Sequence, residues 1–132
     1  MNKESKHILI VDDDVDSLDQ MKMIVESMGY TTMTAINQKE GEKLLEKNKP
    51  DLAIFDLMME NKDSGFILSY KIKKKYPDVP VIIATAVTAE TGMIFGLETP
   101  EARRWIKADH YMEKGIRPDQ LQQTIKRLLK TQ

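Results

Sequence analysis

Five short apolar runs, separated by longer amphipathic stretches, constrain the fold of this chain more than any other feature. The runs are HILIV (7–11), TTMTA (31–35), LAIFD (52–56), VIIAT (81–85) and HYME (110–113). Strands that are apolar along most of their length are typical of a parallel sheet covered by helices on both faces. The sequence therefore predicts an α/β fold built on five strands.

The stretches between these runs carry helical patterns. After the first run, apolar residues recur at steps of three or four and are followed by Gly29, which commonly ends a helix. These residues are Leu18, Met21, Val25 and Met28. Similar patterns predict helices over about 39–47, over 65–76 and after Pro118.

The length of 132 residues predicts a single domain over 1–132. The region 88–108 is unusually long, and Gly92, Gly96 and Pro100 interrupt it. One continuous helix is unfavourable there, so we expect two short helices around a loop.

The composition excludes several classes of function. The chain has 20 basic and 21 acidic residues and a net charge of −1, so its overall charge does not favour binding to nucleic acid or to an anionic membrane. It contains no cysteine, which excludes disulfides and thiolate chemistry. The N-terminus lacks the long apolar stretch of a signal peptide or a membrane span. We expect a cytoplasmic protein without direct nucleic-acid or membrane contacts.

Chemically active side chains follow four of the five runs. Asp12, Asp13 and Asp14 follow the first, while Asp56, Thr85 and Lys114 lie at the ends of the third, fourth and fifth. In an open parallel sheet, ligands bind outside the carboxyl ends of the strands. We therefore expect these residues to converge on one site.

Crowded carboxylates repel one another unless a cation lies among them, and Mg²⁺ prefers carboxylate oxygens. An acidic site with a hydroxyl and a lysine suits phosphoryl transfer to a carboxylate. Each residue alone also has a structural interpretation. Asp14, for example, is assigned as the cap of the following helix, and an isolated Thr85 or Lys114 would be unremarkable. Their joint placement favours the functional interpretation.

The motifs ILIVDDD, PDLAIFDLMM, VIIATA and ADHYMEK resemble, in order and spacing, the receiver domain of two-component response regulators. The resemblance covers essentially the whole chain, and the stand-alone chemotaxis regulator is the best-known small member of this family. It implies a three-layer flavodoxin-like sandwich with parallel strand order 2-1-3-4-5. It also implies a signalling switch that catalyses only its own phosphorylation and dephosphorylation.

The resemblance implies a role for each site residue. Asp56 corresponds to the phospho-accepting aspartate. Asp12 and Asp13 correspond to the acidic pair that binds Mg²⁺ together with Asp56, and the main-chain carbonyl of Met58 is a further ligand.

Beside the metal, Thr85 corresponds to the hydroxyl that reaches the phosphoryl group, and Lys114 to the lysine that pairs with it. Tyr111 occupies the aromatic switch position. The implied partners are a sensor histidine kinase or phosphotransfer protein and a downstream protein target. We expect 88–108 to form an extended fourth-helix region that contacts this target.

The chain departs from the family pattern at three places. Glu60 stands where a proline is common, and Gly65 follows Asp56 by nine residues instead of eight. Gly115 replaces a cis proline after the lysine. About 28 residues separate Thr85 from Lys114, several more than is usual. We expect a longer, less rigid loop over the site and a changed partner surface.

Alternatives remain at this point. The first is a degenerate receiver that acts as a phosphorylation-independent interaction module. The second is a haloacid-dehalogenase-type phosphotransferase, which needs a second acid where this chain has Met58. The third is a flavodoxin-like cofactor binder, whose phosphate loop is replaced here by aspartates that would repel phosphate. For the receiver, the apolar Met58 and Val87 beside the site predict a long-lived phosphoryl group, because neither can orient a hydrolytic water.

Overall fold

The structure is a computed structural model that describes residues 6–57, 59, 64–85 and 108–129. Its strands are β1 (His7–Val11), β2 (Thr31–Ala35), β3 (Leu52–Asp56), β4 (Val81–Thr85) and β5 (His110–Glu113). The bounds of all five predicted strands are confirmed.

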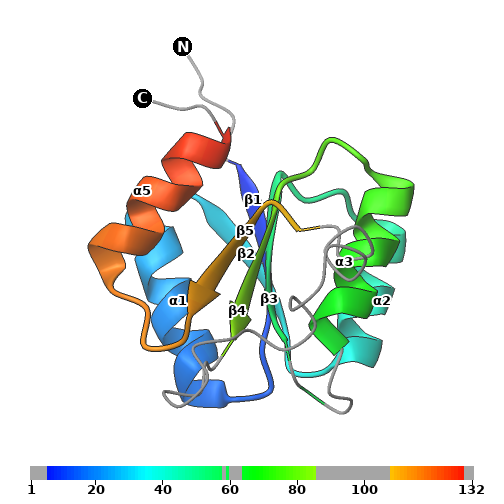
Figure 1. Cartoon of the computed structure of the whole chain (residues 1–132), viewed down its shortest axis with the longest axis horizontal. Helices are drawn as coiled ribbons and strands as arrows, with labels where there is room; N and C mark the ends of the chain where they lie inside the picture. Colours follow the sequence, from blue (N-terminus) through cyan, green and yellow to red (C-terminus); the bar gives the residue numbers. More distant parts are fainter. Residues whose placement is uncertain (1–5, 58, 60–63, 86–107, 130–132) are drawn as a thin grey trace, which may run out of the picture.

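The strands form one parallel sheet of order β2-β1-β3-β4-β5 (Figure 1). The predicted flavodoxin-like order is confirmed. Strand order reverses at β1, because β2 lies on one side of it and β3 on the other. The carboxyl ends of β1 and β3 therefore lie side by side, at the place where open α/β sheets bind ligands.

The described helices are α1 (Val15–Ser27), α2 (Gln38–Lys47), α3 (Ser64–Lys75) and α5 (Pro118–Leu129). In Figure 1, α1 and α5 cover one face of the sheet, and α2 and α3 cover the other. The helix predictions are confirmed to within one residue, with Met28 as the C-cap of α1. The two short helices predicted within 88–108 fall almost entirely outside the described residues.

Each sheet face has its own apolar core, as expected for strands buried on both sides. In β3, Leu52 and Ile54 belong to the cluster beneath α1 and α5, and Ala53 and Phe55 to the cluster beneath α2 and α3. This double burial fixes β3 rigidly, and with it the position of Asp56 at its end.

The start of α1 is fixed by Asp14, whose side chain accepts hydrogen bonds from the backbone N–H groups of Asp16 and Ser17. The predicted cap is confirmed, and the bond to Ser17 lowers the pKa of Asp14. Because Asp14 caps α1, the side chains of Asp12 and Asp13 are not needed for that role.

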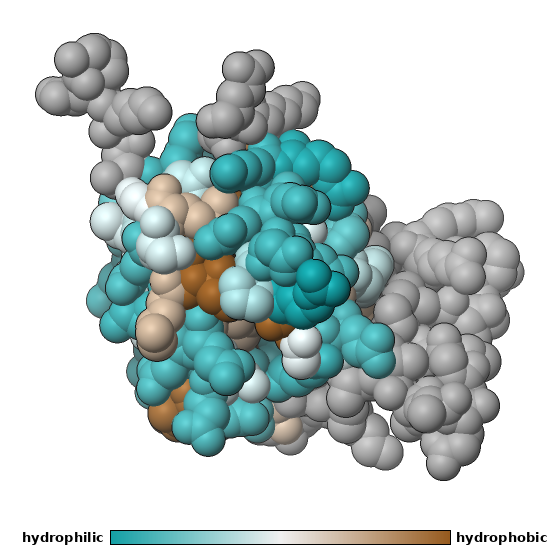
Figure 2. All heavy atoms as spheres, turned by 90° about the vertical axis from the view of Figure 1, so that its left-hand side faces the viewer, coloured by the Kyte–Doolittle hydropathy of each residue, from teal (hydrophilic) through white to brown (hydrophobic). Residues whose placement is uncertain are grey.

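Figure 2 shows the α1 and α5 face, where hydrophilic side chains surround scattered apolar ones. Two of the exposed large apolar residues, Val15 and Met23, belong to α1. Within the described ranges, no helix has the length and hydropathy required to cross a membrane.

Candidate functional site

Three carboxylates meet at the carboxyl ends of β1 and β3. Asp12 and Asp13 follow β1, Asp56 ends β3, and one oxygen from each of the three lies within 4.8 Å of the others. Asp12 is fully buried and Asp56 is 5 % exposed, whereas Asp13 is exposed. The predicted convergence of these acids is thus present in the structure.

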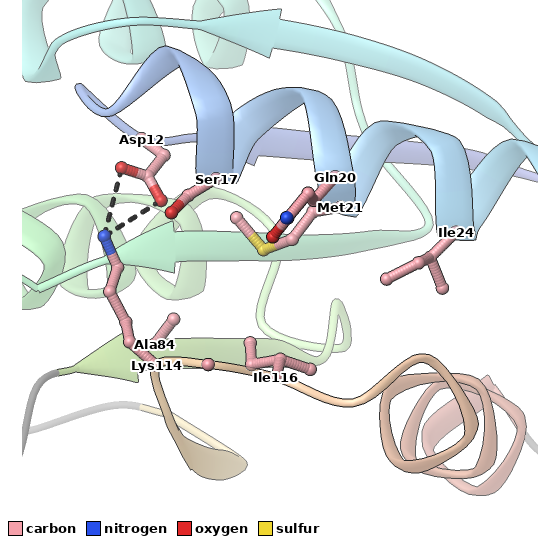
Figure 3. Close-up of a pocket in the computed structure, with 9 residues that line it drawn as sticks. Asp12, Ser17, Gln20, Met21, Ile24, Ala84, Lys114 and Ile116 are labelled. Carbon is pink, nitrogen blue, oxygen red and sulfur yellow. Dashed lines mark hydrogen bonds and ion pairs between the residues drawn. The ribbon is translucent and has the colours of Figure 1, made fainter.

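Lys114 reaches this cluster from the end of β5. Its Nζ lies 3.2 Å from Asp12 Oδ2 and 3.2 Å from Asp56 Oδ1. In Figure 3, its side chain points across the site toward Asp12. The ammonium therefore bridges the two buried carboxylates.

The backbone after Lys114 differs from the family pattern, in which a cis proline follows the lysine. Here the next residue is Gly115. The Lys114 N–H donates to the Thr85 carbonyl over 2.8 Å, which continues the pairing of β5 with β4. Gly115 has φ of +88°, a conformation that residues with a Cβ rarely adopt, and the described segments contain no cis peptide bond. This turn lets the chain leave β5 while Lys114 stays aimed at the acids.

The surroundings of the site raise the pKa values of both Asp56 and Lys114. Burial, followed by the nearby charge of Asp12, raises the pKa of Asp56 to about 7, although Lys114 acts in the opposite direction. Burial opposes the charge on Lys114, but the carboxylates of Asp56 and Asp12 outweigh it and raise its pKa. Lys114 therefore lowers the pKa of Asp56 by less than burial and Asp12 together raise it.

The donor set fits a hard divalent cation. Asp12 Oδ1 accepts hydrogen bonds from the Asp14 N–H and from Lys114. The buried Oδ2 lies 3.2 Å from the Lys114 Nζ but accepts no hydrogen bond from the described residues. Buried carboxylate oxygens normally have such partners. Oxygen ligands with several open positions suit Mg²⁺. The acidic cluster could therefore hold a metal; Met58, the fourth predicted ligand, lies outside the described residues.

Two further predicted residues lie on β4 and β5. Thr85 is buried at the end of β4, whose Ala84 pairs with Asp56 of β3. Tyr111 lies on β5 opposite Ile83 and packs against the α2 and α3 core. Burial, followed by the charge of Asp109, raises the pKa of Tyr111 to about 12, so its hydroxyl is neutral.

Gly65 packs closely against the backbone of Asp56 and Leu57, a contact that its sequence position alone did not reveal. A Cβ at this position would lie 2.6 Å from the Asp56 carbonyl oxygen and 2.8 Å from Leu57 Cα. The Gly65 N–H donates to the Leu57 carbonyl over 2.8 Å. The first turn of α3 is thus pressed against the backbone that carries Asp56, and only glycine allows that approach.

A small pocket opens beside Lys114, between α1 and the segment that follows β5 (Figure 3). Besides Asp12 and Lys114, its polar lining comes from Ser17 and Gln20, and its apolar lining includes Met21, Ile24 and Ile116. Its volume of about 20 Å³ is enough for roughly one water molecule.

Comparisons with known proteins agree with this geometry. The sequence profile of the response regulator receiver domain matches residues 8–126. The crystal structure of a CheY-like response regulator receiver domain protein from Methanospirillum hungatei is similar, with a TM-score of 0.79 and 31 % identity over 96 % of this chain and 95 % of that one.

Curated relatives are also similar in sequence. The probable transcriptional regulator ycf27 of Cyanidium caldarium is 32 % identical over 98 % of this chain and 48 % of its own length. The phosphate regulon transcriptional regulatory protein PhoB of Pseudomonas aeruginosa is 32 % identical over 95 % and 52 %. The chain spans about half the length of these relatives. From the profile match, the strand order and the strand-end residues together, we conclude that the chain belongs to the receiver domain family of two-component response regulators.

Proposed function

We propose that this receiver accepts a phosphoryl group on Asp56 in a Mg²⁺-dependent reaction and uses it as a signalling switch. The observation that carries the proposal is the position of Lys114, whose Nζ lies 3.2 Å from both Asp12 and Asp56. A receiver that served only as a binding module would have no need for a half-buried lysine between two buried acids, because charges withdrawn from water are costly to retain.

In the proposed reaction, a carboxylate oxygen of Asp56 attacks the phosphorus of a phosphohistidine on the donor. The P–O bond of an acyl phosphate forms as the P–N bond breaks, and the electron pair returns to the ring nitrogen. The imidazole leaves neutral when its other ring nitrogen carries a proton. Asp56 is suited to this step because it is held at the end of a rigid strand.

The neighbouring residues would stabilise the negative charge of the phosphoryl oxygens. Asp12, Asp13 and Asp56 would hold Mg²⁺, which supplies positive charge to the phosphoryl oxygens when bound. Lys114 changes partner as the reaction proceeds, releasing Asp56 and pairing with the phosphoryl oxygens. Thr85 lies at the end of the adjacent strand, and its hydroxyl moves toward the phosphoryl group once that group is attached to Asp56. Tyr111 then reorients and reports the change to the β5 surface.

The partners follow from the family. A sensor histidine kinase or phosphotransfer protein supplies the phosphoryl group, and a downstream protein target reads the switch. The relatives PhoB and ycf27 are described as transcriptional regulators, and this chain spans about half of their length. For the receiver itself, we propose signalling through protein contact without direct nucleic-acid binding, in the cytoplasm.

The test is incubation with acetyl phosphate or phosphoramidate and Mg²⁺, followed by intact-mass measurement. We expect one phosphoryl group per chain, with none gained when Mg²⁺ is chelated beforehand or when Asp56→Asn replaces the acceptor. Asp78→Asn, which removes an exposed acid paired with Lys49, is the matched control and should be phosphorylated normally. Failure of the wild-type chain to gain mass under these conditions would favour the degenerate receiver.

A further inference from the structure

β5 lies at the edge of the sheet that the described strands form. Among the described residues it pairs with β4 alone, through four residues, and it carries Tyr111 within it and Lys114 at its end. Movement along the strand displaces a residue by about 3.3 Å per position. Such a displacement would break the 3.2 Å contact between Lys114 and Asp56. The aim of Lys114 therefore depends on what anchors β5.

Asp109 anchors the start of this strand. Its backbone N–H donates to the Val81 carbonyl over 2.9 Å, and its Oδ2 accepts the Val81 N–H over 2.8 Å. The two bonds close a clamp on the first residue of β4. β4 is buried at every position and is therefore held firmly in the sheet. The two bonds to Val81 fix the start of β5 relative to β4.

The same oxygen, Asp109 Oδ2, also lies 2.7 Å from Lys73 Nζ on α3. Exposed ion pairs generally contribute little to stability, but the Lys73 side chain is only 17 % exposed. A short charge-assisted contact of this kind is stronger than an ordinary surface pair. It orients the Asp109 carboxylate toward Val81 and links the end of α3 to the start of β5.

We propose that Asp109, held by Lys73, is a positioning residue that keeps β5 in register so that Lys114 reaches Asp56. Buried Met112 holds the middle of the strand, and the Lys114 N–H holds its end through Thr85. Asp109 supplies the remaining anchor, at the end where β5 begins. The proposal rests on the role assigned to Lys114 in phosphoryl transfer.

The test compares variants of the full chain for phosphorylation by acetyl phosphate and for Mg²⁺ affinity. Asp109→Ala removes both side-chain contacts and should slow phosphorylation roughly 10-fold. Mg²⁺ affinity should stay within about twofold, because the acids that would bind the ion lie on β1 and β3. Asp109→Asn keeps an acceptor for the Val81 N–H and should restore most of the rate. A joint loss of rate and Mg²⁺ affinity would instead indicate general damage and overturn the proposal.

Two further comparisons isolate the route through Lys114. In a Lys114→Met background, Asp109→Ala should slow phosphorylation no further, whereas an additive loss would contradict the proposal. Lys73→Met should give a partial loss. Its matched control is Lys74→Met on the same helix, which makes no ion pair among the described residues and should leave the rate unchanged. If Asp109→Ala fails to fold, Lys73→Met and Asp109→Asn still decide the question.

Amide hydrogen exchange separates this proposal from the proposed function. In Asp109→Ala, the Lys114 amide should exchange roughly 10-fold faster while the Leu9 amide in central β1 is unchanged. This readout holds even if the wild-type chain accepts no phosphoryl group. Unchanged exchange at Lys114, or an equal increase at Leu9, would overturn the positioning role.

Discussion

Lys114 and Asp56 form an ion pair in which the Nζ lies 3.2 Å from Oδ1, although the two residues come from strands separated by β4. The same ammonium contacts Asp12. The resting site therefore holds its lysine in the place where a phosphoryl group would need it, and several consequences can be measured.

Replacing Lys114 by methionine should keep the bulk of the side chain and remove its charge. We expect phosphorylation by a small donor to slow by roughly 10–100-fold, because a cation aimed at the developing charge is lost. The initial rate can be followed by intact mass. Lys126→Met, on the exposed side of α5, should leave the rate unchanged. A Lys114→Met rate within about twofold of wild type would remove the lysine from the mechanism.

The raised pKa of Asp56 predicts a pH-dependent stability. Its pKa is about 7 in the folded protein against 3.8 as the reference, so ionisation is disfavoured by folding. Wild-type stability should therefore fall, relative to Asp56→Asn, as pH rises from about 4 to about 7, and the difference should then level off. At pH 8 without Mg²⁺, Asp56→Asn should be more stable by about 1–2 kcal/mol after allowing for solvent screening.

Urea unfolding at pH 4 and pH 8 measures this difference. Adding Mg²⁺ should reduce it, because a cation that binds the folded state stabilises the wild-type chain. Equal stability of the two proteins at pH 8, with or without Mg²⁺, would show that the ionised Asp56 carries no penalty.

Gly65→Ala should disturb the backbone beneath Asp56. Its Cβ would lie 2.6 Å and 2.8 Å from backbone atoms, which cannot move as side chains do. We expect a loss of about 1–3 kcal/mol in the free energy of unfolding and slower phosphorylation.

Gly41→Ala in α2 is the matched control for this substitution. There a Cβ would meet only side-chain atoms of Val11 and Leu68 at 3.1–3.4 Å, and alanine favours the helix. We therefore expect a stability change close to zero. Chemical denaturation compares the two variants, and equal losses would contradict the special contact at Gly65.

Much of the fold was predictable from the sequence. Polar, chemically active residues lie at or just after the ends of four of the five strands, and the carboxyl ends meet because the strands are parallel. This brought Asp12, Asp13 and Asp56 together without knowledge of the structure. The helices were located to within one residue because caps such as Asp14 and breaks such as Gly29 mark their ends.

The remaining features depend on tertiary contacts that carry no local pattern. The close approach of Gly65 to the Asp56 backbone requires the packing of α3 against β3. The contact of Lys73 with Asp109 joins residues far apart in the sequence, and nothing in KIKKKY distinguishes the one lysine that makes it. The reach of Lys114 depends on the turn at Gly115, where the family pattern suggested another geometry.

The sequence around the site also predicts the lifetime of the phosphoryl group. Met58 and Val87 are apolar and cannot orient a water for hydrolysis. Met58→Asn with Val87→Glu should therefore shorten the lifetime of the phosphorylated protein by roughly 10-fold or more. The decay of a radiolabelled phosphoryl group after removal of the donor measures this, and an unchanged decay rate would show that water access is controlled elsewhere.

The identity of the phosphorylated atom tests the account most directly. After incubation with phosphoramidate and Mg²⁺, borohydride reduces an aspartyl phosphate to homoserine, and peptide mapping locates the change. The account predicts homoserine at position 56 and nowhere else, with none formed when Mg²⁺ is chelated. Conversion at position 12 or 13, or no conversion in any peptide of the wild-type chain, would contradict it.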